Sequence, residues 1–361
     1  MKLRPDFFRD KRVLLTGHTG FKGSWMSLWL AELGAKVHGY ALTPPTTPSL
    51  FDEAGVRERL ASHTIADVRD AAALASAVRE IKPQIVFHLA AQPLVRRSYR
   101  EPRETFDINV MGTVNLLEAV RAAGDVRVCQ VITSDKCYEN NGWAYAYREN
   151  DAMGGSDPYS ASKGAAELVV SAWRRSFFPP EKFSDHAVSL ASARAGNVIG
   201  GGDWAEDRII PDCVRSLMQG QPIPVRSPAA VRPWQHVLEP LGGYLLLAQR
   251  QWEEPEQFAQ GWNFGPHPSG SVTVREVVEI ALKSWGEGTW LDKSDRAQPH
   301  EAHTLKLDIT KASTLMDWEP VMSVQEAVTQ TVGWYRHRAS KNFNARATCL
   351  AQISAYAERM K

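Results

Sequence analysis

The stretch that decides the fold is residues 11–23, which read KRVLLTGHTGFKG. Residues 11–16 have the apolar run of a short buried strand. Residues 17–23 follow at once with glycines spaced G-x-x-G-x-x-G, and a helical pattern then runs over 24–33 until Gly34 ends it. Strand, glycine turn and helix in this order are the context that makes a glycine pattern informative. The stretch therefore predicts a βα unit that binds a dinucleotide, with a purely structural turn as the alternative.

Each glycine of the turn has an expected task. Gly17 allows the tight turn, Gly20 lets backbone N–H groups approach a pyrophosphate, and Gly23 permits close packing of helix on strand. Phe21, within the glycine turn, is expected to contact the same ligand. The spacing differs from the G-x-G-x-x-G of many dehydrogenases.

Strand and helix patterns alternate through the first half of the chain. After the first unit, strands are expected at 35–40, near 65, at 84–92, at 126–132 and at 188–194, and helices at 70–81, 105–123 and 159–176. This alternation is typical of α/β proteins with a Rossmann-type doubly wound parallel sheet. We expect residues 1–190 to form a dinucleotide-binding domain, with later segments returning to it, and 191–361 to form mainly a smaller substrate-binding lobe.

The composition is that of an ordinary globular protein, with 43% hydrophobic and 23% charged residues and a net charge of +1. That charge provides no long-range field for nucleic acid or an anionic membrane. Four cysteines without C-x-x-C spacing argue against a metal site and a disulfide framework. No apolar signal segment or membrane span is recognisable, so we expect a cytoplasmic protein.

Two further strand ends could contact a dinucleotide. Asp67 and Val68 follow the third strand, where a carboxylate could accept from an adenine amino group or instead cap the helix at 70–81. Ala90 ends the fourth strand and leaves room for a flat ligand, or serves only tight packing. The second strand runs into residues 40–43, YALT, without the acidic residue that usually binds the ribose. NAD is expected, with NADP left open.

Tyr159 and Lys163 lie four residues apart, on one face of the expected helix. A neighbouring ammonium favours the ionised phenol, which would make Tyr159 a usable base. The pair could also be an ordinary amphipathic helix start. The fifth strand delivers Ser134, Asp135 and Lys136 to the carboxyl edge of the sheet, where catalytic residues of such folds belong.

Taken together, these motifs resemble the extended short-chain dehydrogenase/reductases, and among them look most like the CDP-D-glucose 4,6-dehydratases. The resemblance covers most of residues 11–330 and is carried by the glycine turn at 17–23, DVR at 67–69, HLAAQ at 88–92, TSDK at 133–136, Tyr159 with Lys163, RAGNVIG at 194–200, GGGDW at 200–204 and RPWQHV at 232–237.

The resemblance implies roles for the residues of the site. Ser134 would bind the sugar 4-hydroxyl, Tyr159 would take its proton, and Lys163 would lower the pKa of Tyr159 and bind the nicotinamide ribose. Asp135, in its protonated form, would donate to the departing 6-hydroxyl. The implied activity is an NAD-dependent lyase that acts on CDP-glucose or a related nucleotide sugar and belongs to deoxysugar and lipopolysaccharide O-antigen biosynthesis.

Lys136 departs from the wider family, whose 4,6-dehydratases commonly carry Thr-Asp-Glu where this chain has Ser134-Asp135-Lys136. A lysine can act as a base only if its pKa falls from about 10.4. It could otherwise stabilise an enolate as a cation, or be a surface lysine without a role.

Polar residues of the second half are candidates for the diphosphate of the substrate. They are Arg194, Asn197, Arg208 and Arg232. Each arginine could equally be an ion-paired surface residue. A nucleotide-sugar 4-epimerase, a dehydratase of another nucleotide hexose and a non-catalytic dinucleotide sensor are the alternative functions. Helices 105–123 and 159–176 could form the two-fold bundle of a homodimer.

Overall fold

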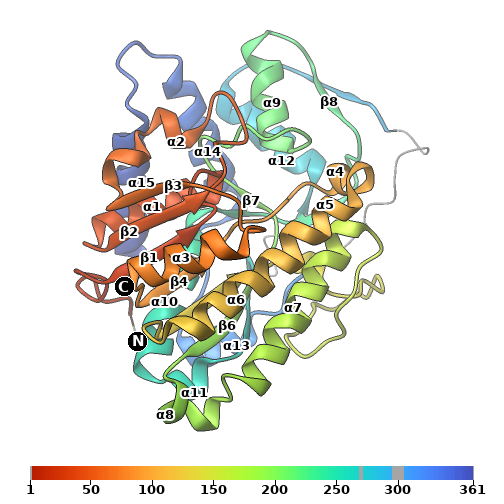
Figure 1. Cartoon of the computed structure of the whole chain (residues 1–361). Helices are drawn as coiled ribbons and strands as arrows, with labels where there is room; N and C mark the ends of the chain where they lie inside the picture. Colours follow the sequence, from red (N-terminus) through yellow and green to blue (C-terminus); the bar gives the residue numbers. More distant parts are fainter. Residues whose placement is uncertain (1, 268–270, 295–304, 361) are drawn as a thin grey trace.

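A seven-stranded parallel sheet forms the centre of the computed structural model, which describes residues 2–267, 271–294 and 305–360 (Figure 1). Its strand order is β11-β6-β5-β4-β1-β2-β3, and every neighbouring pair is parallel. The strands are β1 (Arg12–Thr16), β2 (Lys36–Ala41), β3 (Ser62–Ile65), β4 (Ile85–His88), β5 (Val128–Ile132), β6 (Ser189–Ala195) and β11 (Gly261–Phe264). The order reverses between β1 and β4, which confirms the predicted doubly wound sheet and defines its ligand-binding edge.

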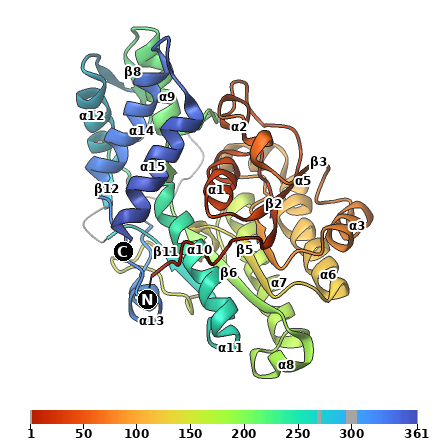
Figure 2. The same cartoon turned by 90° about the vertical axis from the view of Figure 1, so that its left-hand side faces the viewer.

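Both faces of the sheet are buried because its central strands are apolar almost throughout, and successive side chains of a strand point to opposite faces. In β1, Leu14 packs into one core and Val13 and Leu15 into the other. The first core lies under α3 (Ala71–Ile81), α6 (Gly112–Ala123) and α7 (Pro158–Ser176), and the second under α1 (Phe21–Glu32) and α10 (Leu238–Glu253). Figure 2 shows these two helical layers on opposite sides of the strands.

Two helices differ from their predicted bounds. The first begins at Phe21 instead of residue 24, because Gly20 is its N-cap and the last glycine of the turn already lies inside the helix. The helix predicted over 105–123 begins earlier and consists of α5 (Pro102–Phe106), a π-helical turn η2 (Asp107–Met111) and α6. Such π turns are rare and are often found at functional sites.

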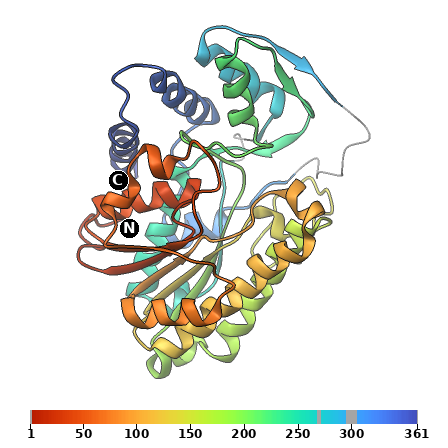
Figure 3. The ribbon, with the colours of Figure 1, turned by 45° about the horizontal axis from the view of Figure 1, so that its top comes forward.

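Smaller elements of the second half gather beyond the carboxyl edge of the sheet (Figure 3). They comprise the strand pairs β7 (Val198–Ile199) with β10 (Gln235–His236), β8 (Ile223–Val225) with β13 (Trp290–Asp292) and β9 (Val231–Pro233) with β12 (Ser271–Thr273), and helices α9 (Ile209–Met218), α12 (Val274–Trp285) and α14 (Val324–Arg338). Helix α12 begins with a capping box, in which Thr273 and Glu276 are bonded to each other's backbone N–H. The remaining segments α11 (Pro255–Phe258), β11 and α13 (Thr310–Met316) return to the main sheet or its edge.

The chain beyond residue 340 contains a packed helix, α15 (Ala345–Arg359). Cys349, Ile353 and Tyr356 are buried on it. Its Tyr356 hydroxyl donates to the buried Glu239 carboxylate of α10 at 2.7 Å. The apolar residues of this helix are mostly alanines, and it completes the core over α1 and α10. Within the described residues, no helix has the length and apolar character needed to cross a membrane.

Candidate functional site

The glycine turn between β1 and α1 is packed so tightly that side chains have no room at two positions. A Cβ at Gly23 would lie 2.1 Å from the carbonyl oxygen of Gly17, and one at Gly17 would lie 2.7 Å from the Ala90 nitrogen. Gly17 also has a φ of 75°, which favours glycine. A Cβ at Gly20, in contrast, would lie 3.4 Å from the carbonyl oxygen of Gly17, which is an ordinary van der Waals distance.

The start of α1 therefore fits the pyrophosphate of a dinucleotide. Among the described residues no side chain caps this helix, so its first N–H groups remain available to an anion. Gly20 has no side chain that would keep the anion away from them. Phe21 lies close to Gly200 of the second half of the chain. The turn thus contacts both the sheet and the segment that was predicted to bind substrate.

Asp67 and Val68 lie at the end of β3 as expected, but in different surroundings. Val68 is buried against Gly112 of α6. The Asp67 carboxylate accepts from Nη2 of Arg69 at 2.6 Å, and this hydrogen bond keeps its pKa below the usual range. The alternative prediction that Asp67 caps α3 is wrong, because Asp70 accepts from the Ala73 N–H in that position.

The N-terminus of α7 holds Tyr159 in place. Asp157 caps the helix by accepting from the Ser160 N–H, and the Tyr159 N–H donates to Oγ of Ser98 at 3.1 Å. Ser162 accepts from Nδ2 of Asn109 at 2.8 Å, in the π-helical turn η2. The start of α7, and Tyr159 with it, is therefore fixed by contacts from two other helical segments.

Ser134, Asp135 and Lys136 follow β5 in a tight turn, η3 (Asp135–Cys137). The Ser134 hydroxyl donates to Oδ1 of Asp135 at 2.9 Å and accepts from the Lys136 N–H at 3.2 Å. Oδ2 of Asp135 is buried and has no hydrogen-bond partner among the described residues. Burial raises the pKa of Asp135, although the nearby charges of Lys136 and Arg232 act to lower it.

The pKa of Tyr159 differs from the sequence expectation. Burial raises it to about 12, against a hydrogen bond with Ser134 and the charge of Arg208, which lower it. Burial also lowers the pKa of Lys163 to about 8, and its ammonium donates to the carbonyl of Ile132 at 3.3 Å. With these neighbours alone the phenol keeps its proton at neutral pH, so activation of Tyr159 requires further positive charge, which a ligand would bring.

Two of the four predicted substrate residues lie close enough to this centre to act on it electrostatically. Arg208 is held by Asp203 at 2.7 Å and acts on Tyr159, whereas Arg232, in β9, acts on Asp135. Asn197 is half-buried, and its carbonyl accepts from the Gln235 N–H.

Arg194 lies apart from these residues. Its guanidinium forms a buried ion pair with Glu167 at 2.7 Å and donates to the Tyr138 hydroxyl at 2.6 Å. A guanidinium committed in this way is not available to a phosphate. The prediction that Arg194 binds the substrate diphosphate is therefore not supported, because its guanidinium is held by internal contacts.

Three residues that we did not predict belong to the surroundings of the site. Asn109 links η2 to α7, Glu167 receives the hydrogen bonds of Thr133 and Ser192, and Lys22 lies near Asp135 and Lys163. Burial and the charges of Arg208 and Lys163 lower the pKa of Lys22 to about 7. The available signals were a polar residue on an apolar helix face and a lysine inside the glycine turn.

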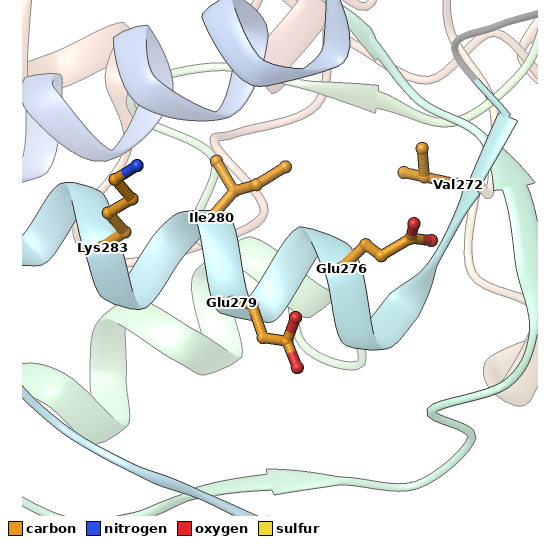
Figure 4. Close-up of a pocket in the computed structure, with 5 residues that line it drawn as sticks. All are labelled: Val272, Glu276, Glu279, Ile280 and Lys283. Atoms are coloured by element: carbon orange, nitrogen blue, oxygen red, sulfur yellow. The ribbon is translucent and has the colours of Figure 1, made fainter.

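A pocket of about 280 Å³ lies elsewhere, on the surface of α12 (Figure 4). It is lined by Val272, Glu276, Glu279, Ile280 and Lys283. None of the predicted site residues lines it, and two of its carboxylates belong to the first turns of the capped helix. We assign it no role in the chemistry.

Comparisons with known proteins agree with this geometry. The sequence profile of the family described as GDP-mannose 4,6 dehydratase matches residues 14–331. The chain is 53% identical over 332 residues to CDP-glucose 4,6-dehydratase of Salmonella typhimurium, covering 92% of both proteins. It is 26% identical to dTDP-glucose 4,6-dehydratase of Neisseria gonorrhoeae, covering 93% of this chain and 98% of the relative.

Solved structures show the same fold. A dTDP-glucose 4,6-dehydratase from Streptomyces venezuelae with NAD bound superposes with a TM-score of 0.74 and 26% identity, over 90% of this chain and 97% of that one. UDP-glucose 4-epimerase of Thermotoga maritima superposes with a TM-score of 0.78, over 91% and 99% of the two chains. At 22% identity, the epimerase is informative about the fold alone.

Proposed function

Because the chain belongs to the GDP-mannose 4,6 dehydratase family of extended short-chain dehydrogenase/reductases, we propose that it converts CDP-D-glucose to CDP-4-dehydro-6-deoxy-D-glucose and water. The observation that carries this proposal is the buried carboxyl of Asp135, next to Ser134. Its raised pKa favours the protonated form, and its Oδ2 is free of hydrogen bonds among the described residues. A carboxylic acid in this state can protonate a leaving hydroxyl.

NAD is the cofactor that the glycine turn, Asp67, Val68, Ala90, Tyr159 and Lys163 would hold, and when bound it supplies the oxidation of C4 and the reduction of C6. The uncapped N-terminus of α1 would bind the pyrophosphate. Burial of Lys163 beside Tyr159 would place a cation where the nicotinamide ribose is expected.

The side chains then divide the proton transfers between them. Ser134 would hydrogen-bond the 4-hydroxyl, and Tyr159 would remove its proton as C4 is oxidised. The resulting 4-ketone makes the C5 proton acidic. Lys136, half-buried beside Asp135, would remove that proton or stabilise the enolate as a cation. Asp135 would protonate the 6-hydroxyl as it leaves, so water is lost across C5 and C6.

The substrate diphosphate would be held on the second-lobe side of the site. Arg232 and Arg208 are the arginines whose charges reach Asp135 and Tyr159, so a diphosphate bound to them would place the hexose between the two groups. Asn197 would contribute from the same side. We propose this arrangement as the role of the lobe built from residues 191–361, with α10, β11 and α15 serving the first domain.

A 4-epimerase would use Ser134, Tyr159 and Lys163 without needing a buried acid at position 135. The acid therefore favours elimination. A dinucleotide sensor would have no use for a fixed phenol and lysine at the same edge of the sheet. The 53% identity to a CDP-glucose 4,6-dehydratase favours CDP over other nucleotides.

We further propose a cytoplasmic homodimer that serves deoxysugar synthesis for the O-antigen of lipopolysaccharide. The support for a dimer is a set of exposed apolar side chains. Met111 lies in η2, Leu168 lies in α7, and Phe177 follows directly after α7. Figure 1 shows α6 and α7 side by side on the outside of the sheet. Apolar side chains on such paired helices suit a two-fold helical bundle.

The direct test is to incubate the protein and NAD with CDP-, dTDP- and UDP-glucose and with GDP-mannose, and to measure the alkaline absorbance of a 4-keto-6-deoxy sugar. Product from CDP-glucose alone or in clear preference supports the proposal. Product from another nucleotide sugar only would reassign the substrate, and no product from any would favour the epimerase.

A further inference from the structure

Glu167 is a buried carboxylate with no place in the reaction outlined above. It lies on α7 four residues after Lys163, so the two side chains share one face of the helix. Its side chain is only 3% exposed. Its Oε1 accepts from the Thr133 hydroxyl, and its Oε2 accepts from Oγ of Ser192 at 2.7 Å and from Nη2 of Arg194 at 2.7 Å.

These contacts join α7 to two neighbouring strands, β5 and β6. Thr133 directly precedes Ser134 at the end of β5, and Ser192 and Arg194 lie on β6. Lys163, the neighbour on α7, donates to the Ile132 carbonyl of the same strand β5. The carboxylate thus lies behind the site and fixes the distance between β5 and α7.

Stability alone does not account for this arrangement. Replacing a buried ion pair with apolar side chains of similar size often leaves a protein equally stable or more stable. The ion pair of Glu167 with Arg194 therefore has to be explained by its position. On its own helix, the charge lies beside the lysine that must be a cation when Tyr159 acts.

We infer that Glu167 is a positioning residue of the reaction, which holds Thr133 next to Ser134 and places a fixed negative charge beside Lys163. This inference deepens the proposed function and rests on it for the meaning of the rate, although the effect on Lys163 can be measured without substrate.

The charges around the two groups support this role. Burial acts to raise the pKa of Glu167, yet Arg194 and the hydrogen bonds from Thr133 and Ser192 lower it overall, so the carboxylate is ionised. Burial lowers the pKa of Lys163 to about 8, and Glu167 opposes that fall. Without the carboxylate, Lys163 would lose its proton at a lower pH.

Other groups also face the pair. The titratable groups near Lys163 are Cys137 on η3, His88 on β4 and Lys22 on α1. The titratable and charged groups near Glu167 are Arg194 on β6, Arg174 on α7 and again Cys137. Burial raises the pKa of the Cys137 thiol and lowers that of His88 to about 3, so both are neutral near pH 8. Among the described residues, Glu167 is therefore the ionised carboxylate whose charge acts on Lys163.

The test compares Glu167→Gln with two matched variants. Glu167→Gln removes the charge and keeps groups that can bond Thr133 and Ser192. The pair Glu167→Gln with Arg194→Met also removes the arginine that would otherwise be buried without its partner. Thr133→Val removes the hydrogen bond and keeps the carboxylate charge.

In both variants that carry Glu167→Gln, we expect kcat to fall while KM for CDP-glucose stays unchanged. The alkaline limb of the pH profile of kcat should move to lower pH by about one unit or more. Thr133→Val should lower kcat without moving that limb. If the double variant folds with the thermal midpoint of the wild type and keeps its kcat and alkaline limb, Glu167 is merely structural and the inference is wrong.

A second readout needs no substrate. The Lys163 amine can be titrated by NMR in protein that carries lysine labelled with carbon-13 at Cε, with its signal assigned by Lys163→Met. We expect a lower midpoint in Glu167→Gln than in the wild type, and an equal midpoint would overturn the inference. If the wild type made no product from CDP-glucose, the proposed function would fail while this titration could still succeed.

Discussion

The Ser134 hydroxyl lies 2.9 Å from Oδ1 of Asp135, while Oδ2 of the same carboxyl is buried without a hydrogen-bond partner among the described residues. In the proposed reaction, the pair would combine a donor for the 4-hydroxyl with an acid for the 6-hydroxyl in adjacent positions of one turn. Because burial raises the pKa of Asp135, the acid keeps its proton at a higher pH than an exposed aspartate does. Its contribution to the rate is lost as pH rises through that raised pKa.

Replacing Asp135 with Asn should stop elimination while leaving C4 oxidation possible. An amide has the same shape but cannot supply a proton to the leaving hydroxyl, so we expect product formation to fall by about 100-fold to 10,000-fold. Recovered CDP-glucose should still exchange its C5 proton with deuterated solvent, which NMR detects. Full activity in the variant, or loss of both product and exchange with an intact fold, would contradict the role of Asp135.

Replacing Lys136 with Ala tests whether this side chain takes part in the removal of the C5 proton. We expect loss of dehydration with an unchanged thermal midpoint and unchanged NAD binding, because the side chain is only half-buried. If Lys136 is the base, C5 exchange into deuterated solvent should also be lost, in contrast to the Asp135 variant. Near-normal turnover would show that Lys136 has no part in the reaction.

Tyr159→Phe should abolish both product formation and C5 exchange, because neither occurs until C4 is oxidised. In the wild type, kcat should follow a bell-shaped pH profile. The rate should rise with pH as the phenol loses its proton, and fall as pH passes the Lys163 pKa of about 8. Steady-state rates across that range, with circular dichroism as the control for folding, test both statements. A flat profile above pH 8 would contradict the requirement for cationic Lys163.

The glycine turn offers a matched pair of variants. In Gly23→Ala the new Cβ would lie 2.1 Å from the Gly17 carbonyl oxygen, so we expect a loss of about 3 kcal/mol or more in unfolding free energy. Gly20→Ala meets no such contact and should keep the thermal midpoint but weaken NAD binding. Calorimetric unfolding and NAD titration measure the two effects. If Gly20→Ala were destabilised as much as Gly23→Ala, the assignment of Gly23 to packing and of Gly20 to NAD binding would be wrong.

The sequence was sufficient to predict the order of the main strands along the chain and the residues at the carboxyl edge of the sheet. The short apolar runs and the glycine spacing are local properties, and parallel strands must bring their ends to one edge. For this reason Gly17, Ser134 and Tyr159 could be assigned to one region from the residues alone.

Long-range contacts explain what could not be predicted. Arg194 matches a motif on the substrate side of the family, yet its side chain is directed to Glu167 by an ion pair between β6 and α7. Helix α15 has mostly alanines as its apolar residues, but the hydroxyl of Tyr356 bonds Glu239, which lies 117 residues earlier in the chain. The pKa of Tyr159 likewise depends on burial by elements that the local pattern does not reveal.

The central claim is that Ser134, Asp135 and Tyr159 carry out an internal oxidation, elimination and reduction of one hexose. CDP-glucose labelled with deuterium at C4 tests it most directly, with the product analysed by mass spectrometry and NMR. We predict a product lighter by one water that retains the deuterium, now at C6. A product of unchanged mass with inverted C4, or a 4-keto-6-deoxy sugar whose C6 hydrogen comes from solvent, would contradict the claim.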